Sequence, residues 1–167
     1  MDNQFLEIPV PTADGVFVAR YSEQGLAELN FPKGRRASSR AARNEIVPTK
    51  IRGWHRLTEA ALKSLLAGRR SPDFPPLDLR GTEFQKGVWN ALRKIPLGQT
   101  KSYGDIARLI GKPKAVRAVG GACGANLIPV LVPCHRILAV NGKIGGFSGG
   151  LDWKRTLLTR EGVKLDS

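Results

Sequence analysis

Cysteine and histidine are scarce in this chain, which holds two of each among 167 residues. Two cysteines cannot build a disulfide framework, so the sequence indicates a reducing setting, cytoplasmic or associated with the nucleoid. Long apolar runs are missing as well, and without a stretch of about 18 apolar residues we expect no membrane span. The first residues lack a basic region followed by an apolar core, so we expect no secretory signal.

Acidic residues are also few, at 14 against 27 Lys and Arg, which gives a net charge of +13. The excess is uneven: residues 80–167 hold 15 of the basic and 5 of the acidic residues, for a net charge of +10, against +3 for residues 1–79. Basic residues can serve solubility alone, but an excess of this size favours a nucleic acid as the partner.

The first half of the chain predicts a small sheet with one helix. Short apolar segments at 5–8, 16–21 and 26–31, separated by turn residues, indicate a meander of three strands. Apolar residues at helical spacing over 52–67 predict an amphipathic helix on that sheet. Its His55 lacks partners for a metal, which favours a surface or packing role. The basic segment 32–50 is predicted to be a surface loop. A stiff, proline-rich connector at 71–76 places the domain boundary, giving 1–76 and 77–167.

The second half predicts several short helices. Thr82 and Gln85 form a capping box for a helix that ends near residue 94. Ser102 is expected to cap a helix over 103–110, and another is expected over 114–123 after a tight turn, which together suggest a helix-turn-helix. Residues 140–143 indicate a hairpin turn. Asp152 is expected to cap a final helix that has Glu161 at its end.

The helix over 114–123 contains adjacent glycines, Gly120 and Gly121, in the run from Arg117 to Ala122. Each glycine inside a helix costs roughly 1 kcal/mol relative to alanine, so close approach of another backbone is the usual reason for one. That backbone could belong to a packed helix or to DNA, and the nearby Lys114 and Arg117 favour DNA. The helix lacks long polar side chains for reading base edges, so binding should not depend on sequence.

The segment Pro133-Cys134-His135-Arg136 ends the apolar run 127–133 and holds one of each scarce residue. A histidine beside a thiol can generate the thiolate, which is the effective nucleophile. The alternative is a buried cysteine next to a histidine of the core. Neighbouring side chains of a strand face opposite ways, so either the backbone turns here or a water bridges Cys134 and His135.

Other cysteine chemistries fit less well. A phosphatase loop needs Arg where Val140 stands, and Cys123 and His55 are not spaced as zinc ligands. The glycine-rich segment 145–150 could form a phosphate nest, but no P-loop helix follows it. A cysteine protease would leave the basic charge unexplained.

With these residues noted, segment 79–164 resembles the O6-alkylguanine-DNA alkyltransferases, which repair DNA by direct reversal. The shared runs are 81–85, Ser102-Tyr103, 112–121, Asn126, 133–136 and 148–150. The resemblance implies an α+β fold, with an RNase H-like sheet and helix followed by a mostly helical, winged-helix-like domain with a helix-turn-helix. Residues 1–70 match only in this general layout.

The resemblance also implies the reaction. Cys134 would take the alkyl group from O6-alkylguanine, or from O4-alkylthymine, in a single turnover. His135 would assist through a water, Glu161 would orient His135, and Asn126 would brace the turn. Tyr103 would push on the flanking phosphate and donate a proton to guanine N3.

The remaining implied contacts concern the base and the duplex. The substrate contacts are Ser148, Ile137, Phe147 and Gly145. The DNA contacts are Arg117, Tyr103, Ala118, Gly121 and Lys114, with Arg117 replacing the flipped nucleotide in the stack. The implied partner is double-stranded DNA bound by a monomer, with cooperativity left open, and no cofactor or metal is expected.

Three departures from the family pattern stand out. Phe147 replaces a tyrosine found in some members, the N-terminal part has no cysteine for the structural zinc of some members, and Gly124-Ala125 replaces a more polar pair. The competing hypothesis is a protein that binds lesions without reacting, as family members without the nucleophile do. The presence of Cys134, His135 and Glu161 favours the transferase.

Overall fold

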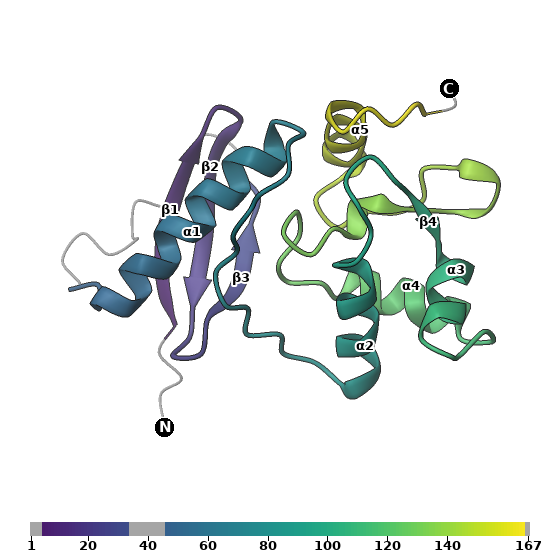
Figure 1. Cartoon of the computed structure of the whole chain (residues 1–167), viewed down its shortest axis with the longest axis horizontal. Coiled ribbons are helices and arrows are strands. Elements are labelled where there is room, and N and C mark those ends of the chain that lie inside the picture. The colour runs from purple at the N-terminus through teal and green to yellow at the C-terminus, as the bar shows by residue number, and fades with distance from the viewer. Residues whose placement is uncertain (1–4, 34–45, 166–167) are drawn as a thin grey trace.

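The computed structural model describes residues 5–33 and 46–165. Strands β1 (Leu6–Thr12), β2 (Gly15–Tyr21) and β3 (Leu26–Asn30) form an antiparallel sheet in chain order, as the turn pattern predicts. Figure 1 shows this sheet on one side of the molecule, with the helical half on the other. Of the predicted surface loop at 32–50, residues 34–45 lie outside the described part.

The first strand is longer than the sequence predicts, because it continues through Pro9 and Pro11. A proline cannot donate to a sheet ladder, which normally confines it to an edge strand. In this sheet β1 pairs only with β2, so the missing N–H groups fall where no partner is needed. Val10, between the two prolines, points into the core and is fully buried.

Helix α1 (Thr49–Leu66) covers one face of the sheet, with Ala61, Leu62 and Leu65 turned inward. His55 lies in the packed layer, where its Nδ1 is 2.8 Å from the buried Tyr21 hydroxyl. Of the surface and packing roles predicted for His55, the structure shows packing.

After a connector, the helical half contains α2 (Glu83–Leu92), α3 (Tyr103–Leu109), α4 (Val116–Gly124) and α5 (Leu151–Arg160). A short strand β4 (Lys101–Ser102) pairs in parallel with β5 (Ile137–Leu138). Short 3-10 turns η1 (Cys134–Arg136) and η2 (Val140–Gly142) flank β5. The connector keeps contact with the sheet, since Leu77 bridges to Leu26.

The N-terminal ends of the helices in the second half of the chain are mostly determined by local sequence. Thr82 and Gln85 form the predicted capping box of α2, and Ser102 forms one with Asp105 at the start of α3. Helix α4 begins two residues later than predicted, because Lys112–Ala115 forms a turn closed by a 2.9 Å hydrogen bond from Ala115 N–H to the Lys112 carbonyl. Helices α3 and α4 pack together as the predicted helix pair.

Two local predictions are wrong. Asp152 does not cap α5: the cap position is Gly150, and Asp152 lies within the first turn without a side-chain capping bond. The turn at 140–143 exists, closed by a 2.7 Å hydrogen bond from Ala139 N–H to the Lys143 carbonyl, but no strand follows it to complete a hairpin. Strand β5 takes its partner from β4 instead, a pairing that local sequence does not encode.

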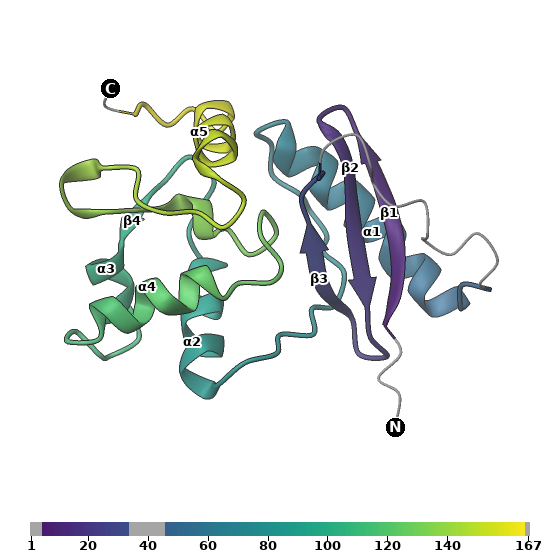
Figure 2. The same cartoon turned by 180° about the vertical axis from the view of Figure 1, so that it is seen from behind.

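The two halves meet along β3, which is the strand nearest the helical half in both views (Figures 1 and 2). The Leu29 N–H donates to the Leu127 carbonyl at 2.9 Å, which ties the segment after α4 to the sheet. Phe31, at the end of β3, packs against Phe147 and Trp153 at ring-centre distances of 5.7 and 5.0 Å. Along the described ranges 5–33 and 46–165, no helix is both long and apolar enough to cross a membrane.

Candidate active site

The apolar run 127–133 does not form a strand. Its backbone turns back on itself, with Val130 at a φ of 74° and a bridge between Pro129 and Val132. Asn126 spans this turn: its Nδ2 donates to the Val132 carbonyl at 2.9 Å, and its Oδ1 accepts from the Ile128 N–H at 2.9 Å. One buried amide side chain therefore holds both ends of the loop that leads to Cys134.

Cys134 and His135 lie in the 3-10 turn η1 that follows Pro133. Of the two arrangements allowed by the sequence, a turn or a continuing strand bridged by water, the backbone adopts the turn. Both side chains are buried, with exposed fractions of 5% for Cys134 and 1% for His135. The His135 Nδ1 has no hydrogen-bond partner among the described atoms, so the Cys134 thiol does not bond to it directly.

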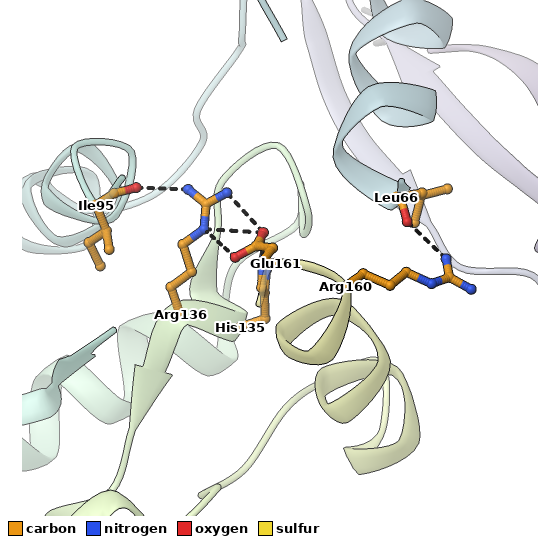
Figure 3. Close-up of polar contacts among 6 residues, drawn as sticks. All are labelled: Leu66, Ile95, His135, Arg136, Arg160 and Glu161. Carbon is orange, nitrogen blue, oxygen red and sulfur yellow. Dashed lines mark hydrogen bonds and ion pairs between the residues drawn. The ribbon is translucent and has the colours of Figure 1, made fainter. Parts of the chain in front are cut away.

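His135 contacts a buried ion pair formed by Glu161 and Arg136 (Figure 3). The His135 Nε2 is 2.9 Å from Glu161 Oε1, and Arg136 donates to the same carboxylate from Nε at 3.0 Å and from Nη2 at 2.9 Å. Arg136 Nη1 also donates to the Ile95 carbonyl at 2.7 Å. Glu161 follows the last residue of α5, so the end of that helix meets the turn that carries Cys134.

The pKa shifts in this cluster define its protonation. Burial alone would raise the pKa of Glu161, but hydrogen bonds from His135 and Arg136 outweigh it and lower that pKa to about 2. Burial lowers the pKa of His135. An ionised carboxylate can only accept, so the His135 Nε2 carries a hydrogen. The lowered pKa of the ring favours its neutral form, in which Nδ1 keeps a free lone pair. His135 is therefore neutral, with a basic nitrogen inside the site.

These shifts predict acid sensitivity. The folded-state pKa of Glu161 is depressed from 4.5 to about 2, so its stabilising contribution to the free energy of unfolding is present above pH 4.5 and lost as the pH falls toward 2. The folded-state pKa of His135 is also depressed, so the unfolded chain binds its proton first and stability starts to fall below pH 6.5.

Urea unfolding of the wild type between pH 7.5 and 3 measures this loss. The Glu161→Gln variant lacks the titrating carboxylate, so its profile should be flatter below pH 4.5. Equal slopes for the two proteins in that range would contradict the assignment.

Lys154 is a component of the site that the sequence analysis missed. Its side chain is fully buried, and its Nζ donates to the Gly146 carbonyl at 3.1 Å. Burial raises the pKa of the Cys134 thiol, while hydrogen bonding by Asn126 and the positive charge of Lys154 act in the opposite direction. Lys154 thus favours the thiolate of Cys134 and anchors the glycine-rich segment.

A sequence signal for Lys154 does exist. It precedes Leu157 and Leu158 by three and four residues, which places it on the buried face of α5. A lysine at such a position is rarely buried without a partner of opposite charge or a function. Arg136 belongs to the segment 133–136, and the structure makes it an ion-pair partner of Glu161.

Three of the predicted substrate residues, Gly145, Phe147 and Ser148, lie in the segment beyond β5, and Ile137 lies in β5 itself. Gly145 faces Tyr103 closely, since a Cβ at Gly145 would come within 3.3 Å of the Tyr103 hydroxyl. Ser148 is exposed and, with Asn126 and Phe31, lines a cavity of about 400 Å³ between the end of β3 and the segment after α4. Ile137 is fully buried in β5. The residues lining this cavity do not include Cys134, so the cavity does not open onto the thiol.

The predicted DNA contacts form a separate, open surface on and before α4. Lys114, Arg117, Ala118 and Gly121 are exposed, and nothing lies within 4 Å of a Cβ placed on Gly121. Gly120 instead faces the Tyr103 ring, 3.9 Å from such a Cβ. The Tyr103 side chain therefore lies between α4 and Gly145.

Cys123 belongs to neither group. It is buried in α4, and burial raises its pKa to about 12, so it stays a thiol at neutral pH. The described residues contain no group of three or more His, Cys, Asp or Glu side chains that could hold a metal ion.

Comparison with known proteins shows to which family this chain is similar. Residues 83–163 match the family model described as 6-O-methylguanine DNA methyltransferase, DNA binding domain. The methylated-DNA--protein-cysteine methyltransferase of Methanosarcina acetivorans is 44% identical over 142 residues, which span 84% of this chain and 87% of that protein. The counterpart from Bacillus subtilis, an inducible form, is 53% identical over 96 residues, or 58% of this chain and 54% of its own length.

The fold agrees with solved structures. The crystal structure of Mycobacterium tuberculosis OGT in complex with DNA has a TM-score of 0.73 and 37% sequence identity, covering 94% of this chain and 91% of that one. The agreement extends over both halves, which confirms the predicted α+β architecture. The protein thus belongs to the O6-methylguanine DNA methyltransferase family and is a methylated-DNA--protein-cysteine methyltransferase, a DNA-binding repair protein.

Proposed function

We propose that Cys134 accepts the alkyl group from O6 of an alkylated guanine in duplex DNA, and from O4 of an alkylated thymine, once per molecule. The observation that carries this proposal is the buried turn η1, where Cys134 adjoins a neutral histidine with an unpartnered Nδ1. Glu161 holds the other ring nitrogen at 2.9 Å. This is the arrangement by which a base activates a thiol.

The transfer proceeds as a displacement at the alkyl carbon. His135 Nδ1 takes the proton of the Cys134 thiol through a water, and the thiolate attacks the carbon attached to O6. The sulfur–carbon bond forms as the carbon–oxygen bond breaks, and the electron pair of that bond goes to guanine. Lys154 stabilises the thiolate before the attack, because its charge favours the ionised sulfur.

Tyr103 donates a proton to guanine N3, which neutralises the negative charge that the electron pair of the broken bond leaves on the base. Burial raises the pKa of Tyr103, so its hydroxyl remains protonated and able to donate. The Ser148 hydroxyl stabilises the charge that develops at O6, and Phe147 and Gly145 form the surroundings of the alkyl group. The Cys134 carbonyl and the Ile137 backbone read the guanine edge, which is a hydrogen-bonding role that needs no side chain.

The reaction is stoichiometric because a thioether is a poor leaving group, so the alkyl group stays on Cys134. The alkyl donor is the damaged base itself, so the mechanism requires no cofactor. The target nucleotide must leave the stack to reach a thiol as buried as Cys134. The exposed face of α4 provides the approach, with Lys114, Ala118 and Gly121 against the duplex and Arg117 filling the gap.

Intact mass spectrometry tests the proposal directly. After incubation with duplex DNA containing O6-methylguanine, the protein should gain one methyl group per molecule, and peptide mapping should place it on Cys134. Binding of the lesion without any mass gain would instead identify a lesion-binding protein. A methyl group on Cys123 would contradict the assignment of the nucleophile.

A second experiment tests the flipping role of Arg117. Removing its side chain in Arg117→Ala should slow repair of duplex DNA by about 10- to 100-fold, since an extruded base costs a few kcal/mol of stacking and pairing. Reaction with the free base O6-benzylguanine should change little, because a free base needs no extrusion. Equal losses on both substrates would contradict a flipping role.

We propose further that the protein acts as a monomer and that the two halves divide at 76/77.

The affinity for DNA should fall steeply with added salt and vary little with DNA sequence, since the contacts are to phosphates. The open, small-residue face of α4 supports this, because it offers no long polar side chains for base edges except Arg117.

A further inference from the structure

Arg160 and Glu161 are adjacent at the end of α5, yet their side chains extend in opposite directions (Figure 3). Glu161 reaches the buried cluster with His135 and Arg136. Arg160 reaches the N-terminal half, where it meets the end of α1. Two consecutive residues therefore connect the histidine beside the nucleophile to a half of the chain that holds none of the predicted site residues.

The contact on the Arg160 side is a two-pronged ion pair with a third hydrogen bond. Nη1 and Nη2 donate to the two carboxylate oxygens of Asp14 at 2.8 and 2.7 Å. Nη1 also donates to the Leu66 carbonyl at 2.9 Å. Asp14 lies in the turn between β1 and β2, and Leu66 is the last residue of α1, so the guanidinium bridges two elements of the N-terminal half.

The backbone is held at the same place. Gly68, just after α1, has a φ of 72°, and a Cβ there would lie 2.0 Å from the Arg160 carbonyl oxygen. No side chain fits between these two segments. The end of a helix usually frays, because its last carbonyls lack helical partners. In α5, the contacts of Arg160 with the N-terminal half hold the last residue of the helix in place, directly before Glu161.

We propose that Arg160 and Asp14 are a positioning pair for alkyl transfer: they fix the end of α5 so that Glu161 holds the His135 ring in its reactive orientation. This inference depends on the proposed function, in which His135 is the base. It gives the N-terminal half a part in the reaction without contact with the DNA or with the transferred group.

The pair differs from a purely structural ion pair in what it should affect. The side chains of Arg160 and Asp14 are 37% and 23% exposed, so solvent screens the pair, and even with its two-pronged geometry it should add only modestly to stability. Small displacements of a catalytic group are costly to the rate, however, up to about 10²-fold for one ångström. Loss of the pair should therefore reduce the rate more than the stability.

The experiment uses the full chain and three variants: Asp14→Asn, Arg160→Gln and Arg160→Lys. Single-turnover transfer from duplex O6-methylguanine should be about 10-fold slower in the first two, with unfolding midpoints close to the wild type. Arg160→Lys keeps the charge and should recover part of the rate. Arg20→Gln is the matched control, because Arg20 also pairs with two carboxylates, Glu7 and Glu28, but lies far from α5 in the chain. Its rate should be unchanged.

A second readout follows the histidine directly. The chain has only two histidines, so the hydrogen-bonded Nε2–H resonance of His135 can be assigned by NMR with a His55→Gln variant. This resonance should be protected from solvent exchange in the wild type and in Arg20→Gln, and lost or broadened in Asp14→Asn and Arg160→Gln. Unchanged rates and resonances in both variants would overturn the positioning role. If the wild type forms no methyl adduct, the proposed function fails, while the resonance still decides whether the pair positions His135.

Discussion

Replacing Cys134 with alanine should abolish alkyl transfer and leave DNA binding intact. The substitution removes the only atom proposed to form the bond to the alkyl carbon, and the other buried thiol, Cys123, stays protonated at neutral pH. We expect the rate to fall by about 10⁴-fold or more, the scale on which loss of a nucleophile acts in enzymes. The fold should survive, because Cys134 is small and the loop around it is held by Asn126. Single-turnover transfer and a DNA-binding titration measure the two effects.

Cys123→Ala is the matched control. Cys123 is also buried, and its pKa of about 12 keeps it protonated. Its variant should keep the stoichiometric methyl gain, whereas the Cys134→Ala protein should gain no methyl group while still binding the lesion. Transfer at the wild-type rate by Cys134→Ala would require another acceptor. Loss of binding together with transfer would mean that the thiol matters for the structure of the site.

The elements that the sequence predicts well are those specified by neighbouring residues. The capping boxes at Thr82 and Ser102 each depend on a side chain three positions along, so the starts of α2 and α3 follow from local sequence. The error at Asp152 has the same origin: an acidic residue near a helix start resembles a cap, but Gly150 had already begun the turn. The pairing of β4 with β5 joins segments more than 30 residues apart, and no local pattern encodes it.

The site divides in the same way. The turn at Cys134 was one of two arrangements that the sequence allowed, since adjacent side chains of a strand cannot face each other. The environment of that turn depends on distant contacts. Lys154 is buried beside it because α5 packs there, and Arg136 joins Ile95 and Glu161, which lie 41 and 25 positions away. Such contacts arise from tertiary packing and leave no local pattern. The roles of Tyr103 and Glu161 could therefore be predicted only from the resemblance to a family.

Glu161→Ala should destabilise the protein more than any surface substitution. Removing the carboxylate leaves the Arg136 guanidinium buried with only the Ile95 carbonyl as a partner, and it leaves the His135 Nε2–H without an acceptor. Breaking a buried ion pair by removing one partner costs about 3–5 kcal/mol. For a chain of this length each kcal/mol shifts the unfolding midpoint by about 2–4 °C, so we expect a decrease of about 6–20 °C. Thermal and urea unfolding measure it.

Glu83→Ala controls for the loss of a glutamate, because Glu83 is exposed and lies 4.0 Å from its nearest cation, Lys86. Its unfolding should match the wild type.

A double variant, Glu161→Ala with Arg136→Met, distinguishes the effect of an unpaired charge from the effect of lost packing. If the unpaired guanidinium is the cause, replacing it with an apolar side chain of similar length should recover most of the stability, since buried pairs often exchange for apolar residues at little cost. Stability should then return without alkyl transfer, because His135 would still lack the carboxylate that orients it. A double variant as unstable as Glu161→Ala would assign the loss to packing around α5.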